Sequence, residues 1–284
     1  MVNSSTGYES GRGLALVLGA GGIKGWAHIG VLKVLHEAGV QVNHIVGASA
    51  GALIGPLYAA RRDAAEAERI AMSFTPADFL EWHLNGLCLS PQGGRMGRRL
   101  WQAYGRLDFR ELDVSFASVA LDVATGRPVV LRAGSVGPAV EASIRPPIIS
   151  RPVRIDGRAL VDGGLQNAVP VSLARQLGAA AVVSVNVGEL LVLPRPLRPL
   201  SARLSAACRG RSAAADIRGQ VAFLAGLLSR GSRTHERADI EIRPDMRGIS
   251  SMWPWYIRRA EARGRAAARR ALPAIQRLLA ARAV

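Results

Sequence analysis

The pentapeptide Gly47-Ala48-Ser49-Ala50-Gly51 is the first feature of this sequence that could do chemistry. Its serine falls at a predicted strand-to-helix turn between small residues, where a hydroxyl can stand exposed at a strained elbow and act as a nucleophile. The helix expected from Ala50 directs its dipole and free N–H groups toward that oxygen, which favours a developing negative charge. A structural interpretation competes with this one, because serine is also a favoured N-cap residue.

A glycine-rich turn at residues 19–25 (GAGGIKG) joins another predicted strand to another helix. We expect the main-chain N–H groups of Gly21, Gly22 and Ile23 to point into one concavity, where they can stabilise the oxyanion of an acyl-transfer intermediate. A dinucleotide or phosphate site is the competing interpretation. The loop lacks the G-x-G-x-x-G frame of a dinucleotide site and the Ser or Thr that follows the lysine of a P-loop. Lys24 itself could bind a substrate phosphate or be an exposed residue of the first helical turn.

The third candidate is the run Val161-Asp162-Gly163-Gly164, which follows an extended segment. A carboxylate in a tight glycine turn has little steric cover and can accept a proton from a serine hydroxyl. A partly dry site raises the pKa of such a carboxyl and makes it a better base. Asp162 could also be an ordinary turn residue, as Asp156-Gly157 nearby is expected to be.

These three segments need a scaffold, and the hydrophobic pattern predicts one. A strand at 14–18, a helix at 26–39, a strand at 42–49 and a helix from 50, kinked or restarted at Pro56, imply parallel strands joined by a right-handed crossover. The rest of the chain is expected to contain helices over 64–112 with a loop at 89–97, two strands within 115–132, a helix at 136–143, a strand-turn-strand over 153–164, a short helix at 173–178, strands at 180–187 and 239–245, and a helix or helix pair at 257–283.

This order predicts an α/β fold, with a central, mostly parallel sheet in a single domain over residues 13–284. Residues 1–12 are expected to be a flexible N-terminus without a secretory signal. The segment 188–237 is rich in Pro, Arg and Ala, and we expect an insertion or a lid there. Residues 257–283 form an arginine-rich helical region in this interpretation.

The chain carries a net charge of +16, most of it from arginine. Such an excess is either a solvated face or an attraction to anionic partners, of which a membrane surface fits better than nucleic acid. No basic motif with interleaved aromatic residues or zinc-finger pattern supports nucleic acid. The chain has two cysteines and no disulfide framework, so the predicted compartment is the cytoplasm. The excess of arginine further predicts peripheral contact with the inner membrane surface.

In this order, the three segments resemble the patatin-like phospholipase family. LVLGAGGIKGWAHIGVLKVL is similar to that family's oxyanion-loop segment, HIVGASAGALIG to its nucleophile segment and LVDGGLQNAVPV to its aspartate segment. ASVALDVATGRPVVLRAG resembles the strand pair between them. The resemblance covers residues 13–187, with a weaker echo at 238–280, and implies a three-layer α/β/α fold. It also implies hydrolysis of acyl esters of phospholipids, lysophospholipids or neutral lipids, with neither metal nor cofactor.

Carried over by position, the resemblance makes Ser49 the nucleophile and Asp162 the general base, with oxyanion donors from Gly21, Gly22 and Ile23. Gly25 is then the residue that permits the close turn. The sequence departs from the family in two places. Ala20 stands where many members have the first glycine of the loop, and 145–150 (RPPIIS) replaces the usual proline-glycine run, which bears on the shape of the acyl pocket.

Two rival hypotheses remain at this point. A Ser-His-Asp triad would need a histidine after Asp162, and His235 is the one that has this place in the sequence. A non-catalytic regulatory or scaffold protein could keep the same fold, although the retained serine and aspartate argue against it. The predicted partner of the enzyme is a lipid ester substrate.

Overall fold

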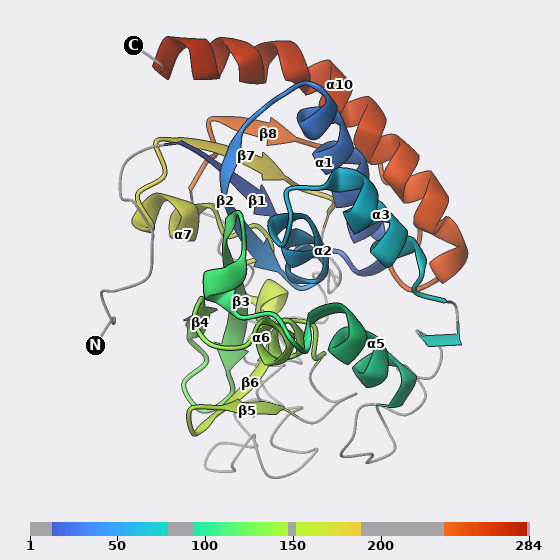
Figure 1. Ribbon diagram of the computed structural model, residues 1–284, viewed down its shortest axis with the longest axis vertical. Helices are drawn as coiled ribbons and strands as arrows, with labels where there is room; N and C mark the ends of the chain where they lie inside the picture. Colours follow the sequence, from blue (N-terminus) through green and yellow to red (C-terminus); the bar gives the residue numbers. More distant parts are fainter. Residues whose placement is uncertain (1–12, 76, 79–93, 147–151, 189–235, 283–284) are drawn as a thin grey trace, which may run out of the picture.

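The computed structural model describes residues 13–75, 77–78, 94–146, 152–188 and 236–282. The described strands form one eight-stranded sheet in the order β5-β6-β3-β2-β1-β7-β8, with β4 paired to β3 off this path (Figure 1). The strands are β1 (Leu14–Leu18), β2 (Val42–Ala48), β3 (Ser115–Asp122), β4 (Pro128–Leu131), β5 (Val153–Ile155), β6 (Arg158–Asp162), β7 (Ala181–Val185) and β8 (Ile240–Ile242). The sheet is mixed but mostly parallel, as expected, because the pairings among β3, β2, β1, β7 and β8 are all parallel.

Helices cover both faces of the sheet, which explains why the central strands are apolar throughout. In β1, Leu14, Leu16 and Leu18 pack in one core cluster, whereas Ala15 and Val17 pack in another. The first cluster lies under α1 (Ala27–Glu37), α2 (Ala50–Ala59), α3 (Ala64–Met72) and α10 (Ile257–Arg282), and the second lies under α7 (Val171–Gln176). Figure 1 shows α1, α2, α3 and α10 grouped together and α7 apart from them.

Strand β3 explains how two distant parts of the chain meet. Its Ser118 pairs with Gly47 of β2 and with Leu131 of β4, and its Leu121 pairs with Val161 of β6 and with Pro128 of β4. Since β4 occupies one edge of β3 along this stretch, β2 and β6 share the other edge, running toward each other. Their last residues, Ala48 and Asp162, pair with Val119 and Ala120 respectively, so the carboxyl ends of β2 and β6 converge on adjacent residues of β3.

Several predicted elements differ in detail from the structure. Helix α2 continues through Pro56 instead of restarting there; every residue of this helix is buried, and the Pro56 carbonyl still accepts a hydrogen bond from the Ala60 N–H. Helix α5 (Gly94–Tyr104) begins inside the segment expected to be a loop. Of the two alternatives predicted for the C-terminal segment, a helix or a helix pair, the structure has the single helix, α10. The expected flexible segment 1–12 and nearly all of the predicted lid at 188–237 lie outside the described residues.

The remaining described elements connect the strands or lead into the helices. Helix α6 (Val136–Ser143) has the predicted bounds and packs against β3 and β6. Short 3-10 turns are η1 (Gly22–Trp26), η2 (Phe109–Glu111), η3 (Gly163–Leu165) and η5 (Pro254–Tyr256). Among the described helices, none has both the length and the hydropathy needed to cross a bilayer.

Candidate active site

Ser49 lies at the point where β2 passes into α2, with a backbone conformation of φ 51° and ψ −116°. Residues other than glycine rarely adopt this region, so the turn is strained and lifts the side chain out of the helix. The hydroxyl makes no capping hydrogen bond to α2; it donates instead to Asp162 Oδ2 at 2.7 Å. The structure therefore does not support the N-cap interpretation of Ser49. Glycine is required two residues later, because a Cβ on Gly51 would collide with the Leu18 carbonyl.

Asp162 is the last residue of β6, and its side chain is only 3% exposed. Burial raises the pKa of its carboxyl to about 6, against the opposing effect of hydrogen bonds from the Ser49 hydroxyl and the Gly164 N–H. Gly164 donates to Oδ1 at 2.8 Å, which leaves Oδ2 directed at Ser49. By contrast, Asp156 and Gly157 form the exposed positive-φ turn between β5 and β6, as an ordinary Asp-Gly pair does.

Ser143, the last residue of α6, was not identified from the sequence. Its buried hydroxyl accepts a hydrogen bond from the Ser49 N–H at 3.0 Å and donates to the Val119 carbonyl at 2.6 Å. It therefore holds the backbone of the strained turn against β3. A serine at the end of a predicted helix gives no such signal, because only the fold brings α6 to this turn.

The glycine loop lies beside Ser49. A Cβ on Gly25 would collide with Ala50 Cβ, and a Cβ on Gly164 would collide with Ala20 Cβ while lying 3.5 Å from Ser49 Cβ. Gly25 thus permits the close approach of the loop to the start of α2. The N–H groups of Gly21 and Gly22 donate to no acceptor within the described part of the chain.

Ile23 corrects one expectation about this loop. Its N–H donates to the Ser251 carbonyl at 2.9 Å and is therefore not free to hold an oxyanion. The 3-10 turn η1 begins at Gly22, where φ is 58°, and this rotation turns the next N–H toward the chain segment before α10. Of the three expected donors, Gly21 and Gly22 remain available in this arrangement.

His28, in the first turn of α1, supports the other end of the loop. It is fully buried, and its Nε2 lies 2.8 Å from the Gly19 carbonyl oxygen. Because a carbonyl only accepts, this nitrogen carries the proton and donates it to Gly19. Desolvation lowers the pKa of the imidazole to about 4, so His28 is neutral in the physiological range. It positions the loop and forms no hydrogen bond with the Asp162 carboxylate.

The other candidate groups form no hydrogen bond or ion pair with Ser49 or Asp162 within the described residues. Lys24 is half-buried in η1 and forms no ion pair with a described residue. His235, the candidate for a triad, lies outside the described residues. Within the described ranges, no cluster of His, Cys, Asp and Glu side chains could hold a metal ion.

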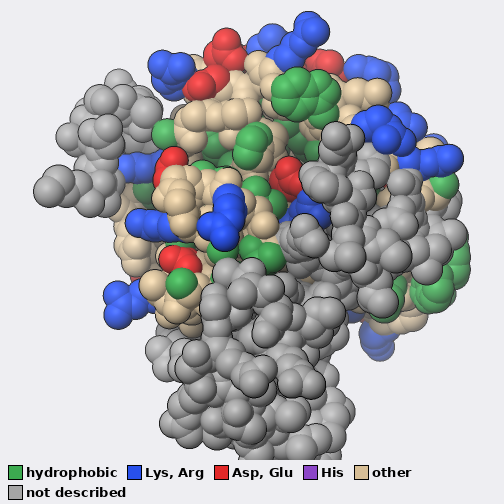
Figure 2. Space-filling model, turned by 90° about the horizontal axis from the view of Figure 1, so that it is seen from below, with side chains coloured by type: hydrophobic (Ala, Val, Ile, Leu, Met, Phe, Trp, Pro, Cys, Tyr) green, Lys and Arg blue, Asp and Glu red, His purple; other side chains and the backbone are tan. Residues whose placement is uncertain are grey.

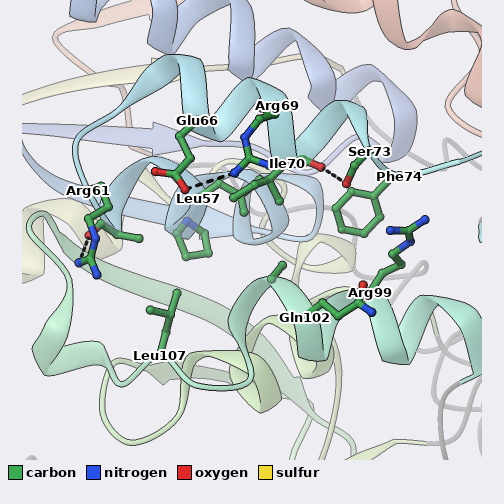
Figure 3. Close-up of a pocket in the computed structure, with 13 residues that line it drawn as sticks. Leu57, Arg61, Glu66, Arg69, Ile70, Ser73, Phe74, Arg99, Gln102 and Leu107 are labelled. Atoms are coloured by element: carbon green, nitrogen blue, oxygen red, sulfur yellow. Dashed lines mark hydrogen bonds and ion pairs between the residues drawn. The ribbon is translucent and has the colours of Figure 1, made fainter.

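A cavity of about 420 Å³ lies between α2, α3 and α5. Figure 3 shows Leu57, Ile70 and Phe74 on its walls, with Arg61 and Arg99 at its margins. It lies at the carboxyl end of α2, about two helical turns or roughly 12 Å along the axis from Ser49. We therefore do not assign the acyl chain to this cavity.

Comparison with known proteins gives a family match over a region that includes both Ser49 and Asp162. The family model for patatin-like phospholipase matches residues 16–175. An uncharacterized NTE family protein of Mycobacterium tuberculosis is 35% identical over 184 residues, which are 64% of this chain and 32% of that relative. Patatin-like phospholipase domain-containing protein 6 of Homo sapiens is 32% identical over 193 residues, covering 63% of this chain and 14% of its own length. This chain thus spans about a third or less of the length of these relatives.

The fold has a solved counterpart as well. The crystal structure of VipD from Legionella pneumophila superimposes with a TM-score of 0.54 and 14% sequence identity. The superposition covers 93% of this chain and 67% of that one. At this identity the likeness concerns the fold alone, and it agrees with the α/β arrangement of sheet and helices described above.

Proposed function

The chain belongs to the patatin-like phospholipase family, a membership that implies lipid acyl hydrolase activity, and on that premise we propose that it is a serine hydrolase using Ser49 and Asp162 as a dyad. The observation that carries this proposal is the 2.7 Å hydrogen bond from the Ser49 hydroxyl to a buried carboxylate, made from a strained strand-to-helix turn. A structural serine would use its hydroxyl to cap the helix, which Ser49 does not do.

In the first half of the reaction, Ser49 Oγ attacks the acyl carbonyl carbon of a lipid ester while its proton moves to Asp162 Oδ2. The raised pKa of Asp162 suits this task, because a base titrating near pH 6 accepts a proton more readily than an ordinary aspartate and is still ionised at pH 7. Collapse of the tetrahedral intermediate breaks the ester bond. Asp162 then returns the proton to the leaving alkoxide, and the acyl group stays on Ser49.

The negative charge on the tetrahedral intermediate needs donors that other groups do not already use. The Gly21 and Gly22 N–H groups meet this requirement in the described part of the chain. The first intrahelical hydrogen bond of α2 runs from the Leu53 N–H to the Ser49 carbonyl, so the N–H groups of the first turn also face this end of the helix. Water activated by Asp162 releases the fatty acid in the second half-reaction. In this proposal Lys24, a half-buried residue of η1, binds the phosphate of a phospholipid substrate.

The decisive experiment is hydrolysis of a soluble p-nitrophenyl ester and of a panel of phospholipids, lysophospholipids and neutral lipids by the wild type and by Ser49→Ala. We expect the variant to lose at least about 10⁴-fold in kcat. A fluorophosphonate probe should label the wild type at Ser49 only. Ser143→Ala is a useful comparison because it removes another buried serine hydroxyl near the site but leaves the nucleophile.

The competing hypothesis is a non-catalytic protein with this fold. It predicts that wild type and Ser49→Ala hydrolyse every ester at the same background rate and that the probe labels neither. The strain at Ser49 argues against it, because a turn without a chemical task would be better served by glycine.

A further inference from the structure

We propose that the segment Met252–Trp255 and the outer face of α10 together dock the protein on an anionic lipid surface. Figure 2 shows why the net charge alone does not define such a surface: on the face drawn there, Lys and Arg side chains are spread out, several of them beside acidic ones. The proposal rests instead on a place where exposed aromatic rings adjoin arginines that have no carboxylate partner among the described residues.

The aromatic part precedes α10. Trp253 and Trp255 stack with ring centroids 4.8 Å apart, and their side chains are 47% and 64% exposed. Met252 beside them is 52% exposed. Pro254 between the two tryptophans is buried and begins η5, so it fixes the pair on the surface. Tryptophan is the residue that best tolerates the boundary between lipid headgroups and acyl chains, since its ring is apolar and its N–H is polar.

The cationic part is a stripe along α10. The inner face of this helix is buried through residues such as Ala260, Gly264 and Ala267. Five exposed arginines fall within about 120° of one another around the helix axis at 100° per residue: Arg258, Arg259, Arg269, Arg270 and Arg277. Within the described residues none of them has an ion pair.

Other arginines of the same helix show the contrast. Arg263 pairs with Asp245, Arg265 with Glu261 and Arg282 with Asp239. The five stripe arginines, defined above, are therefore the part of α10 whose positive charge no described carboxylate neutralises. Phosphate headgroups would complement this charge, and the tryptophan pair at the amino end of the stripe favours a bilayer over a nucleic acid, which has no apolar phase to receive it.

The docking surface is continuous with the proposed oxyanion loop. The Ser251 carbonyl, next to Met252, accepts the hydrogen bond from the Ile23 N–H. Further along, Gly264 of α10 lies so close to α1 that a Cβ there would collide with the Ala27 carbonyl. A surface held by Trp253 and Trp255 would thus bring the glycine loop to the membrane, where a lipid ester is presented.

The test is vesicle flotation in the Ser49→Ala background, so that binding is measured without hydrolysis and independently of the proposed function. We expect binding to phosphatidylcholine vesicles with 30% phosphatidylglycerol and weak binding to pure phosphatidylcholine. Raising the salt concentration should release the protein. Replacing the five stripe arginines by Gln should lower partitioning by at least about 100-fold, since each cation near the surface contributes about fivefold.

Each set of variants has a matched control. Trp253→Ala with Trp255→Ala should lower partitioning by about tenfold or more, whereas Trp101→Ala removes a tryptophan that is 67% exposed on α5 and should change nothing. Five exposed arginines on other elements serve as the control for the stripe when replaced by Gln: Arg61, Arg106, Arg127, Arg154 and Arg158. All variants should keep wild-type activity on a soluble ester when Ser49 is present.

Three results would overturn the proposal. One is equal binding to neutral and anionic vesicles, and another is equal loss in the stripe variant and its arginine control. The third is that duplex DNA displaces the protein from vesicles and that replacing the tryptophan pair does not change binding. This result would assign the stripe to nucleic acid. If a variant fails to fold, quenching of tryptophan emission by brominated lipid in the double variant Trp82→Phe, Trp101→Phe decides the matter. Buried Trp26, Trp253 and Trp255 are its remaining tryptophans, and the proposal requires the latter two to reach the acyl region.

Discussion

Two strand-to-helix junctions lie side by side in this protein and are built for different purposes. One leads from β1 into η1, and the other leads from β2 into α2. The strands are parallel neighbours, with Leu18 paired to Gly47, so both junctions open at the same edge of the sheet. At the second junction a serine adopts φ 51°; at the first a glycine, Gly22, adopts φ 58°.

The hydrogen bonds at the two junctions account for the difference. At the β2 junction the backbone N–H of Ser49 is occupied by Ser143, and the side chain is left to meet Asp162. At the β1 junction the carbonyl of Gly19 is occupied by His28, and the N–H groups of Gly21 and Gly22 have no described acceptor. One junction therefore presents a side chain and the other presents backbone donors, each fixed by a residue from a different helix.

Asp162→Asn should have the largest effect on this arrangement. An amide can still accept from Gly164 but cannot take the Ser49 proton, so we expect kcat on any cleaved ester to fall by about 10⁴-fold. We do not expect the variant to lose stability. Because burial raises the pKa of Asp162 to about 6, ionisation of its carboxyl disfavours the folded state. The free energy of unfolding of the wild type therefore falls as the pH rises from about 4 to about 6.

At pH 7, Asp162→Asn should therefore unfold at a urea concentration no lower than the wild type. Steady-state hydrolysis and urea unfolding measured on the same preparation separate the two effects. A variant that is both unfolded and inactive would mean that Asp162 is a structural anchor of the junction and not its base.

His28→Phe tests the other junction. It leaves the buried Gly19 carbonyl without its donor, which frees the loop to move, and a displacement of about 1 Å in a catalytic group can cost up to about 100-fold in rate. We expect kcat to fall by about 10- to 100-fold with KM little changed. His28→Gln retains an N–H donor and should recover much of the loss. Equal loss in both variants would indicate that the imidazole has a role beyond holding Gly19.

The pH dependence distinguishes the two buried titrating groups. Activity that needs ionised Asp162 should fall about tenfold per unit below pH 6, because a single proton inactivates the base. His28, with its pKa lowered to about 4, should contribute no inflection between pH 5 and 8. The profile of kcat/KM for a soluble ester measures this directly. An inflection near 6.5 that disappears in His28→Gln would contradict the assignment.

The sequence predicted the parts of the two junctions that depend on neighbouring residues. Strand, turn and helix follow each other directly at each junction, over residues 14–37 and over residues 42–59. The four elements β1, α1, β2 and α2 could therefore be placed from hydrophobic periodicity and glycine positions. The meeting of Ser49 and Asp162 followed from the resemblance to a family, not from spacing. The structure adds its cause, which is the shared edge of β3.

What could not be predicted were contacts between elements distant in sequence. Ser143 reaches Ser49 across 94 residues, and Ser251 reaches Ile23 from the far end of the chain. The first supports the expected turn, whereas the second occupies an N–H that was expected to be free. The role of His28 could not be predicted either. It lies in a helix with a clear apolar pattern, and that pattern does not show that the histidine is buried and bonded to the Gly19 carbonyl.

The smallest expected effect concerns the backbone strain at Ser49, which the glycine at the β1 junction avoids. In proteins already inactivated at residue 49, Ser49→Gly should be more stable than Ser49→Ala by about 1 kcal/mol, since glycine adopts φ 51° and ψ −116° without the cost that a Cβ imposes. The same exchange in an ordinary helix has the opposite sign: Ala65→Gly, at an exposed position of α3, should lose about 1 kcal/mol. Urea unfolding of three proteins measures both differences: Ser49→Gly, Ser49→Ala, and Ser49→Ala combined with Ala65→Gly. If glycine at residue 49 destabilised the protein as it does at residue 65, the β2 junction would carry no strain, and its serine would differ from the glycine at the β1 junction in side chain alone.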